Sequence, residues 1–93
     1  MGKKKAHLHS ERDNIAVALV GLEEGDVVII VRGDTETPIK IREAVPFGHK
    51  FAIEEIRAGG EVTKYGGFIG KALRDIGRGD HVHVHNIKGV KYT

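Results

Sequence analysis

A short motif that recurs three times constrains the fold of this chain more than any other feature of its sequence. Each copy has an alanine, an aliphatic residue four positions later, then glycine, an acidic residue and a β-branched residue. Glycine at a fixed place favours a turn whose backbone conformation other residues resist, and the β-branched residue favours a strand. The motif therefore predicts three corners that each join two strands, in a compact, bent, all-β body. The copies run from Ala18 to Val27, from Ala52 to Val62 and from Ala72 to Val82.

Hydrophobic patterning predicts short strands around these corners. Residues 15–20 have no polar face, which indicates a strand buried on both sides. Residues 68–76 fit a helix by periodicity, but the glycines within and after them favour strand and turn. The expected strands are 15–20, 27–31, 37–42, 49–53, 61–65 and 80–86, with a weak edge strand over 3–9 and a tail over 87–93.

Length and composition indicate one small domain over residues 1–93. The chain has no cysteine, which excludes disulfides and cysteine-bound zinc and favours a reducing compartment. Its longest apolar run, residues 15–20, is far shorter than the ~20 residues that cross a bilayer. We therefore expect a cytoplasmic protein with no membrane partner.

The charge pattern argues against a nucleic-acid partner. Fifteen basic and thirteen acidic side chains leave a net charge of +2 and are mixed along the chain, apart from Lys3–Lys5. Nucleic-acid binders usually gather basic residues on one face, often with aromatic residues for stacking. An RNA-binding barrel that uses Lys3–Lys5 is therefore the least favoured alternative.

Three histidines near the end of the chain give the strongest chemical signal. His81, His83 and His85 alternate with valines, which predicts a strand with the three imidazoles on one face. At strand spacing, His83 and His85 would lie roughly 6.6 Å apart between Cα atoms and could bind one metal ion. His49, a carboxylate or the substrate would then be the third ligand. The alternatives are contact with substrate or a subunit interface without metal, or an ordinary polar face.

Other candidate residues lie earlier in the chain. In Gly48-His49-Lys50 the glycine allows a ligand to approach the backbone, and the two side chains point to opposite faces unless the strand is bulged. Lys64 is a second candidate cation, and Tyr65 fits packing better than acid catalysis. Asp13-Asn14 can cap the turn before the first buried strand, a structural role. His7 and His9 are expected near a solvated terminus.

Several short segments of the chain, taken in order, resemble the SAF domain of the altronate/galactarate dehydratase family. The resemblance covers about residues 9–88. The matching segments are Asp13-Asn14-Ile15-Ala16-Val17-Ala18, Gly48-His49-Lys50-Phe51-Ala52, Lys64-Tyr65-Gly66 with Ile69-Gly70-Lys71-Ala72, and Asp75-Ile76 leading into His83-Val84-His85-Asn86.

This resemblance implies a small β-clip fold and a part in a hydro-lyase that removes water from a sugar acid such as altronate or galactarate. It also implies a divalent metal, usually Fe(II), held mainly in a separate large catalytic subunit, with which this chain would form a hetero-oligomer. The chain would then be a small subunit that is inactive alone. The alternatives are a sulfolactate sulfo-lyase small subunit, in which sulfite leaves, and a non-catalytic SAF module that binds a sugar acid or a metal.

The resemblance also suggests roles for particular residues. His81 is left out of the core site, because the family pattern is looser there. The expected catalytic residues are His49, Lys50, His83 and His85; the expected substrate-binding residues are Lys64, Tyr65 and Asn86; and the expected metal ligands are His83 and His85.

Overall fold

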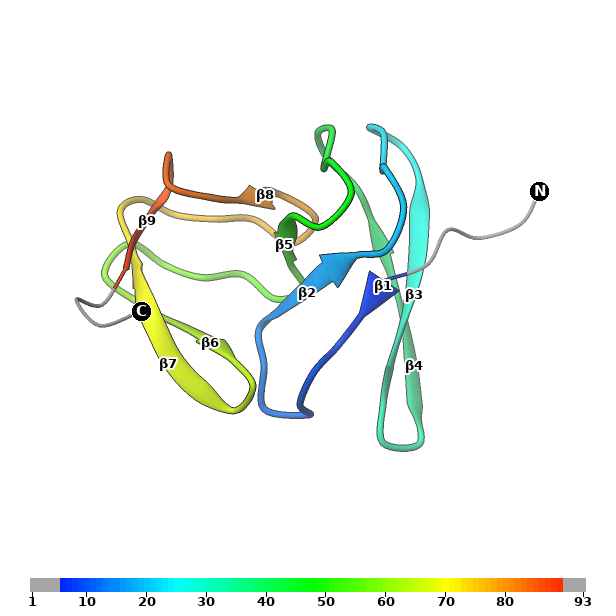
Figure 1. The fold of residues 1–93 in the computed structure, drawn as a ribbon, viewed down its shortest axis with the longest axis horizontal. Helices are drawn as coiled ribbons and strands as arrows, with labels where there is room; N and C mark the ends of the chain where they lie inside the picture. Colours follow the sequence, from blue (N-terminus) through cyan, green and yellow to red (C-terminus); the bar gives the residue numbers. More distant parts are fainter. Residues whose placement is uncertain (1–5, 90–93) are drawn as a thin grey trace.

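The computed structural model describes residues 6–89, which form strands and turns without a helix (Figure 1). The predicted all-β class is confirmed. No helix long and apolar enough to span a membrane occurs in this part of the chain. The strands of residues 6–89 are β1 (Ala6–His7), β2 (Ile15–Ala18), β3 (Val27–Arg32), β4 (Thr35–Lys40), β5 (Lys50–Ala52), β6 (Glu61–Lys64), β7 (Gly67–Ala72), β8 (His81–Val82) and β9 (Ile87–Gly89).

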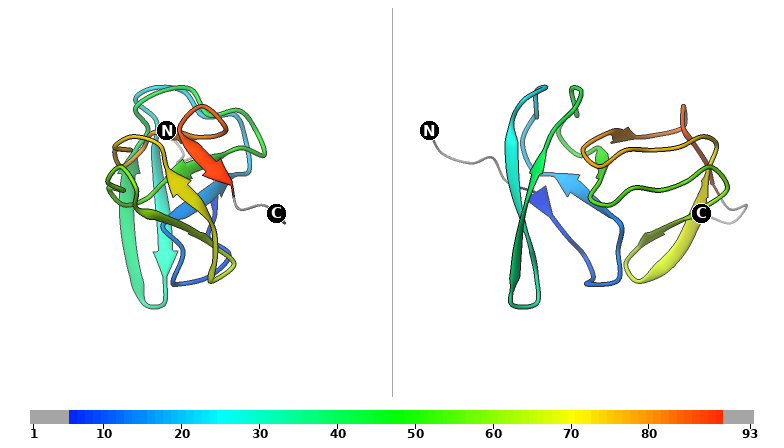
Figure 2. Two further views of the ribbon diagram at one scale, coloured as in Figure 1. Left: turned by 90° about the vertical axis from the view of Figure 1, so that its left-hand side faces the viewer. Right: turned by 180° about the vertical axis from the view of Figure 1, so that it is seen from behind.

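These strands make three small antiparallel sheets. The central sheet has the order β1-β2-β5-β8, the second sheet is the β3-β4 hairpin, and the third has the order β6-β7-β9. In Figure 1 the β3-β4 hairpin lies to the right of the central sheet and the β6-β7 hairpin to its left. Figure 2 shows that the two hairpins stay on opposite sides when the molecule is seen from behind.

Four corners, one more than predicted, connect the hairpins to the central sheet. Each corner contains a glycine with positive φ, between 82° and 93°: Gly25, Gly48, Gly59 and Gly79. The additional corner includes Gly48, which lies outside the three copies of the motif. Corners also pair with each other, because backbone bridges join Leu22 to Val45 and Ile56 to Ile76.

The paired corners divide the chain into two similar units that share β5. In the first unit the Gly48 N–H donates to the Ala18 carbonyl oxygen at 2.8 Å, and in the second the Gly79 N–H donates to the Ala52 carbonyl oxygen at 2.8 Å. Each unit therefore runs from a central strand through a corner, a hairpin and a second corner to the next central strand. The repeated sequence motif reflects this repetition of the structural unit.

The core is split into two clusters by the alternation of side chains in the central sheet. Ala16, Ala18 and Phe51 belong to one cluster with the β3-β4 hairpin. Ile15 and Ala52 belong to the other, with residues of β6, β7 and β8. The strand predicted over 15–20 is thus buried on both sides, but it ends at Ala18, and Leu19 and Val20 after it are exposed.

The long histidine strand predicted over 80–86 is wrong. β8 covers only His81–Val82, residues 83–86 form a turn, and β9 begins at Ile87. Val82 is fully buried whereas Val84 is 77% exposed, so these two valines do not share a buried face. The physical reason is that the Asn86 side chain, rather than a neighbouring strand, takes up backbone hydrogen bonds of this segment.

Candidate functional site

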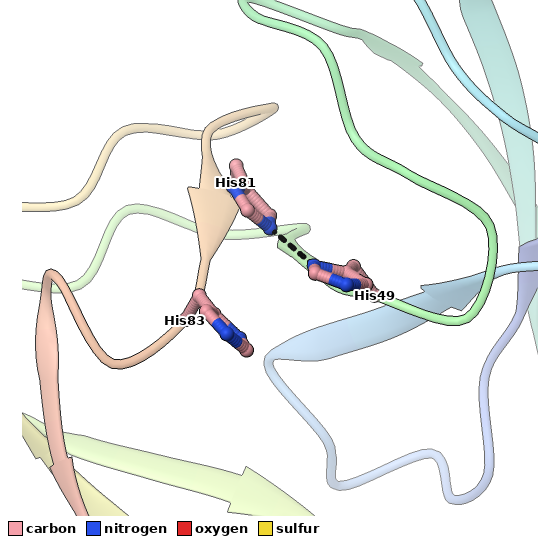
Figure 3. Close-up of side chains that lie close together, drawn as sticks. All are labelled: His49, His81 and His83. Carbon is pink, nitrogen blue, oxygen red and sulfur yellow. Dashed lines mark hydrogen bonds between the residues drawn. The ribbon is translucent and has the colours of Figure 1, made fainter.

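Three imidazoles from two distant segments meet at one end of β5 and β8 (Figure 3). We call His49, His81 and His83 the histidine cluster. His49 Nδ1 lies 2.9 Å from His81 Nε2, and the His83 ring centroid lies 4.8 Å from that of His49. One ring nitrogen from each residue can be chosen so that all three lie within 4.8 Å of one another.

Antiparallel pairing of β5 with β8 creates this cluster. Lys50 is opposite Val82 and Phe51 is opposite His81. Continuing this register by one residue places His49, which precedes β5, opposite His83, which follows β8. Residues 32 or more positions apart in the chain therefore become neighbours through strand pairing.

The buried side chain of Asn86 holds the turn that carries His83. Its Oδ1 accepts a hydrogen bond from the His83 N–H at 2.9 Å, and its Nδ2 donates to the His81 carbonyl oxygen at 2.7 Å. The N–H groups of Asn86 and Ile87 also donate to the His83 carbonyl oxygen. Asn86 is only 4% exposed, so its amide positions the histidines; the predicted contact with substrate stays a prediction.

His81 is partly buried, and its ring lies against those of His49, His83 and His85. Burial lowers its pKa, and the neighbouring imidazoles, His49 first, lower it further, whereas Glu43 opposes the shift. The Glu43 carboxylate also accepts a hydrogen bond from the His81 N–H at 3.1 Å. A lowered pKa favours the neutral imidazole, which can accept a proton or bind a metal ion.

The structure changes which histidines belong together. His85 contacts His81, with ring centroids 5.3 Å apart, but the trio whose ring nitrogens converge contains His81 in its place. Sequence reasoning left His81 out of the core site. The alternation that grouped it with His83 was the available signal, and the register that sets it beside His49 was not visible in the sequence.

Lys50 points away from this cluster. It follows His49 in an unbulged strand, so the two side chains leave opposite faces, as the sequence predicted. Lys50 is half-buried, and its pKa is lowered by burial and then by the charge of Lys64. Among residues 6–89 no carboxylate forms an ion pair with either lysine. The two lysines, which we call the lysine pair, thus influence each other's charge and have no ion-pair partner among the described residues.

Tyr65 and His9 extend the lysine pair toward the β6-β7 turn. The Lys64 Nζ lies 5.1 Å from the centroid of the Tyr65 ring, and the His9 ring stacks on the same ring at 4.0 Å. Burial, His7 and Lys64 lower the pKa of His9, and Asp13 opposes them. His9 thus belongs to a defined contact and is not simply part of a solvated terminus.

Asp13 has a structural role, but at a different turn from the one predicted. It is 1% exposed, and its two carboxylate oxygens accept hydrogen bonds from the N–H groups of Tyr65 and Gly66. Both of these turn residues have positive φ, 57° and 74°, the pattern of a type I′ hairpin. The Asn14 side chain binds the backbone of β6 beside it. Together they fix the position of Lys64 and Tyr65.

A surface pocket of about 880 Å³ lies apart from the histidine cluster and the lysine pair. No histidine lines it, although its wall includes Arg42, whose neighbour Glu43 contacts His81. Its lining residues are Glu24, Gly25, Pro38, Lys40, Ile41, Arg42 and Arg78.

Comparison with known proteins gives one family. Residues 4–90 match the family described as altronate/galactarate dehydratase SAF domain. The chain is 49% identical over 76 residues to altronate dehydratase of Escherichia coli K12, a match that covers 82% of this chain and 14% of that protein. It is also 43% identical over 44 residues to galactarate dehydratase (L-threo-forming) of the same organism, which covers 47% of this chain and 8% of that protein.

A second kind of relative has nearly the same length as this chain. The (2R)-sulfolactate sulfo-lyase subunit alpha of Chromohalobacter salexigens is 34% identical over 84 residues, which covers 87% of this chain and 89% of that subunit. The chain thus spans about one seventh of altronate dehydratase but almost all of a protein named as a subunit.

Proposed function

Because the chain belongs to the altronate/galactarate dehydratase SAF-domain family, we propose that it serves a sugar-acid lyase and acts with a larger catalytic polypeptide. Two facts support the larger partner: the matched region is 14% of altronate dehydratase, and a relative of similar length is named as a subunit. The observation that carries a role in the reaction is the convergence of His49, His81 and His83 at an open end of the central sheet.

Elimination of water from a 2,3-dihydroxy acid needs three kinds of group. A base removes the proton next to the carboxylate, a cation stabilises the enolate, and an acid or Lewis acid assists the departure of hydroxide. The histidine cluster fits the proton-transfer steps, because imidazole is a common general acid and base in proteins and His83 is exposed. A divalent metal, Fe(II) by family resemblance, would supply the Lewis acid.

The lysine pair fits the carboxylate of the substrate. Lys50 and Lys64 have no acidic partner among the described residues, and an anion would relieve their mutual repulsion. His49 and Lys50 leave opposite faces of β5, so one substrate can reach both clusters only across the start of that strand. Gly48 lies there with open space where a side chain would stand. We assign the carboxylate to the lysine pair and the proton transfer to the histidine cluster.

The test is reconstitution. The untagged chain would be purified alone and together with the larger lyase polypeptide of its host, and each sample would be given altronate, galactarate and (2R)-sulfolactate. We expect turnover only in the complex, with a 2-keto-3-deoxy acid from a sugar acid. In the complex, Lys64→Gln should raise KM more than it lowers kcat, and His83→Gln should do the reverse.

Three results would contradict this function. Turnover by the isolated chain would refute the division between two polypeptides. A chain that purifies without a partner, and binds an acid without turnover, would indicate a non-catalytic SAF module. Release of sulfite from sulfolactate, without dehydration of either sugar acid, would assign the chain to the sulfo-lyases, an alternative favoured by its match to 89% of a sulfo-lyase subunit.

A further inference from the structure

We propose that His49, His81 and His83 form a binding site for one divalent transition-metal ion, held by this chain without ligands from a partner. The inference goes beyond the proposed lyase function, because family resemblance places the metal mainly in the larger subunit. It rests on the arrangement of three imidazoles. An ion bound to all three rings would replace the proton-transfer role given to them above, and the base would then come from the larger polypeptide.

The distances between the ring nitrogens suit a single ion. Imidazole nitrogens bind zinc at 2.0–2.1 Å, so two donors of a tetrahedral site lie about 3.3 Å apart. Here His49 Nδ1 and His81 Nε2 are 2.9 Å apart, and the most separated donors of the trio are within 4.8 Å. Small rotations of the rings, above all of exposed His83, bring all three onto one ion.

The backbone around these ligands is already fixed. The N–H of His81 donates to Glu43, and the Asn86 amide bridges the backbone of His81 and His83. His49 follows the Gly48 corner and accepts a hydrogen bond from the Ala18 N–H through its carbonyl oxygen. Supporting contacts of this kind keep ligands oriented and strengthen metal binding.

The local electrostatics also suit a cation. Besides burial, the pKa of His81 is shifted by the neighbouring histidines, which lower it, and by Glu43, which raises it. Lys50 leaves the opposite face of its strand. Three imidazoles beside one carboxylate can therefore bind a divalent ion through their neutral forms.

Three protein ligands leave at least one coordination position open. Structural zinc sites usually have four protein ligands, whereas catalytic sites keep a position for water or substrate. His83 is exposed and the other two imidazoles are partly exposed, so the open position faces outward. Imidazole donors suit Zn²⁺, Fe²⁺, Co²⁺ and Ni²⁺ and are poor ligands for Mg²⁺ and Ca²⁺.

The experiment is a metal titration of the full chain without a histidine tag. Zn²⁺ binding would be measured by calorimetry, and Co²⁺ would be added as a probe because its visible absorption reports the geometry and the ligands. We expect one ion per chain, and we expect His83→Ala and His49→Ala each to weaken binding by at least about 100-fold, more than loss of a supporting contact does. Mg²⁺ should not compete.

Two matched variants decide which histidines bind. His85→Ala separates the proposed trio from the His83–His85 pair predicted by spacing, and we expect it to leave affinity within about threefold. His9→Ala removes a histidine that lies near the lysine pair, and it should have no effect on metal affinity. Circular dichroism of each variant shows whether it is folded, and exposed His83 can be replaced with little risk to folding.

The proposal is overturned if the wild-type chain binds neither ion at micromolar concentration, or if His85→Ala or His9→Ala weakens binding as much as His83→Ala does. The result is independent of the reconstitution assay. Metal binding without lyase activity would refute only the proposed function, and lyase activity without metal binding by the isolated chain would refute only this inference.

Discussion

The turn that carries His83 depends on one buried amide, and its removal is a quantitative test of the site. Asn86→Ala deletes two hydrogen bonds, of 2.9 Å to the His83 N–H and of 2.7 Å to the His81 carbonyl oxygen. A buried donor or acceptor that loses its hydrogen-bond partner lowers the free energy of unfolding by about 1–3 kcal/mol. Water reaches His81 and His83 in part, so we expect a loss of about 2–4 kcal/mol in the free energy of unfolding.

Such a loss is large for a domain of this size. Small domains have total stabilities of about 5–15 kcal/mol, and each kcal/mol corresponds to roughly 4–8 °C in Tm. We therefore expect Asn86→Ala to unfold roughly 8–32 °C below the wild type, measured by circular dichroism with heat and with urea. Affinity for Zn²⁺ should fall about 10–100-fold in the same variant, as it does when a supporting contact of a ligand is lost.

Val84→Ser is the matched control in the same turn. Val84 is 77% exposed, so its replacement should change stability by less than about 0.5 kcal/mol. If Asn86→Ala is as stable as this control, the amide does not hold the turn, and the predicted role in substrate binding becomes the better explanation for Asn86. Asn86→Asp should lie between the two, because one oxygen still accepts from His83 while the other meets a carbonyl oxygen.

Three further predictions concern stability and use the same assay. Asp13→Asn replaces an oxygen that accepts from the backbone of the β6-β7 turn by an NH₂ group, and should cost about 2–3 kcal/mol; an unchanged Tm would refute the capping role. Gly79→Ala should cost more than Gly25→Ala, because both glycines have similar φ but a Cβ at Gly79 alone would meet a β4 carbonyl oxygen; equal losses would contradict the close approach. Lys50 has a lowered pKa, so its charge destabilises the fold at neutral pH. Lys50→Met should therefore be more stable than the wild type at pH 7, with the gain shrinking as pH rises toward the ordinary lysine range; exposed Lys71→Met should show no such trend, and a Lys50→Met gain that grows with pH would reverse the sign.

The corners were predictable because their cause is local. A glycine must occupy a conformation with positive φ, and an aliphatic side chain must lie under the turn, so both leave a mark in the sequence. Three of the four corners, the buried start of β2 and the strand-and-turn nature of residues 68–76 follow from such local patterns. The pairing of corners, Leu22 with Val45 and Ile56 with Ile76, has no local cause, and the sequence could not reveal it.

The histidine segment shows why a clear local pattern can mislead. Alternation of histidine and valine predicts a strand only if the backbone finds a partner strand. Asn86 supplies the missing hydrogen bonds from its side chain, and the chain turns after Val82. Contact between His49 and His83 survives this error, because it depends on the register of β5 and β8. His81 was left out of the predicted site because the family pattern is looser there, and its contact with His49 depends on the same register.

The position of the histidine cluster follows from the point at which the duplication ends. In the pairing of β2 with β5, Ile15 is opposite Ala52, and both are buried in one core cluster. Ala18 and Gly48 of the first unit correspond to Ala52 and Gly79 of the second, because each pair makes the same backbone hydrogen bond. Counted from these residues, His49 and His83 occupy the positions that correspond to Ile15 and Ala52. At this point the first unit continues into another corner, which covers Ile15 and Ala52, so both of these residues must be apolar. The second unit turns away at Asn86, so the corresponding pair is uncovered and free to carry imidazoles. The fold thus keeps its repeated positions for structure and exposes reactive side chains where the repeat stops.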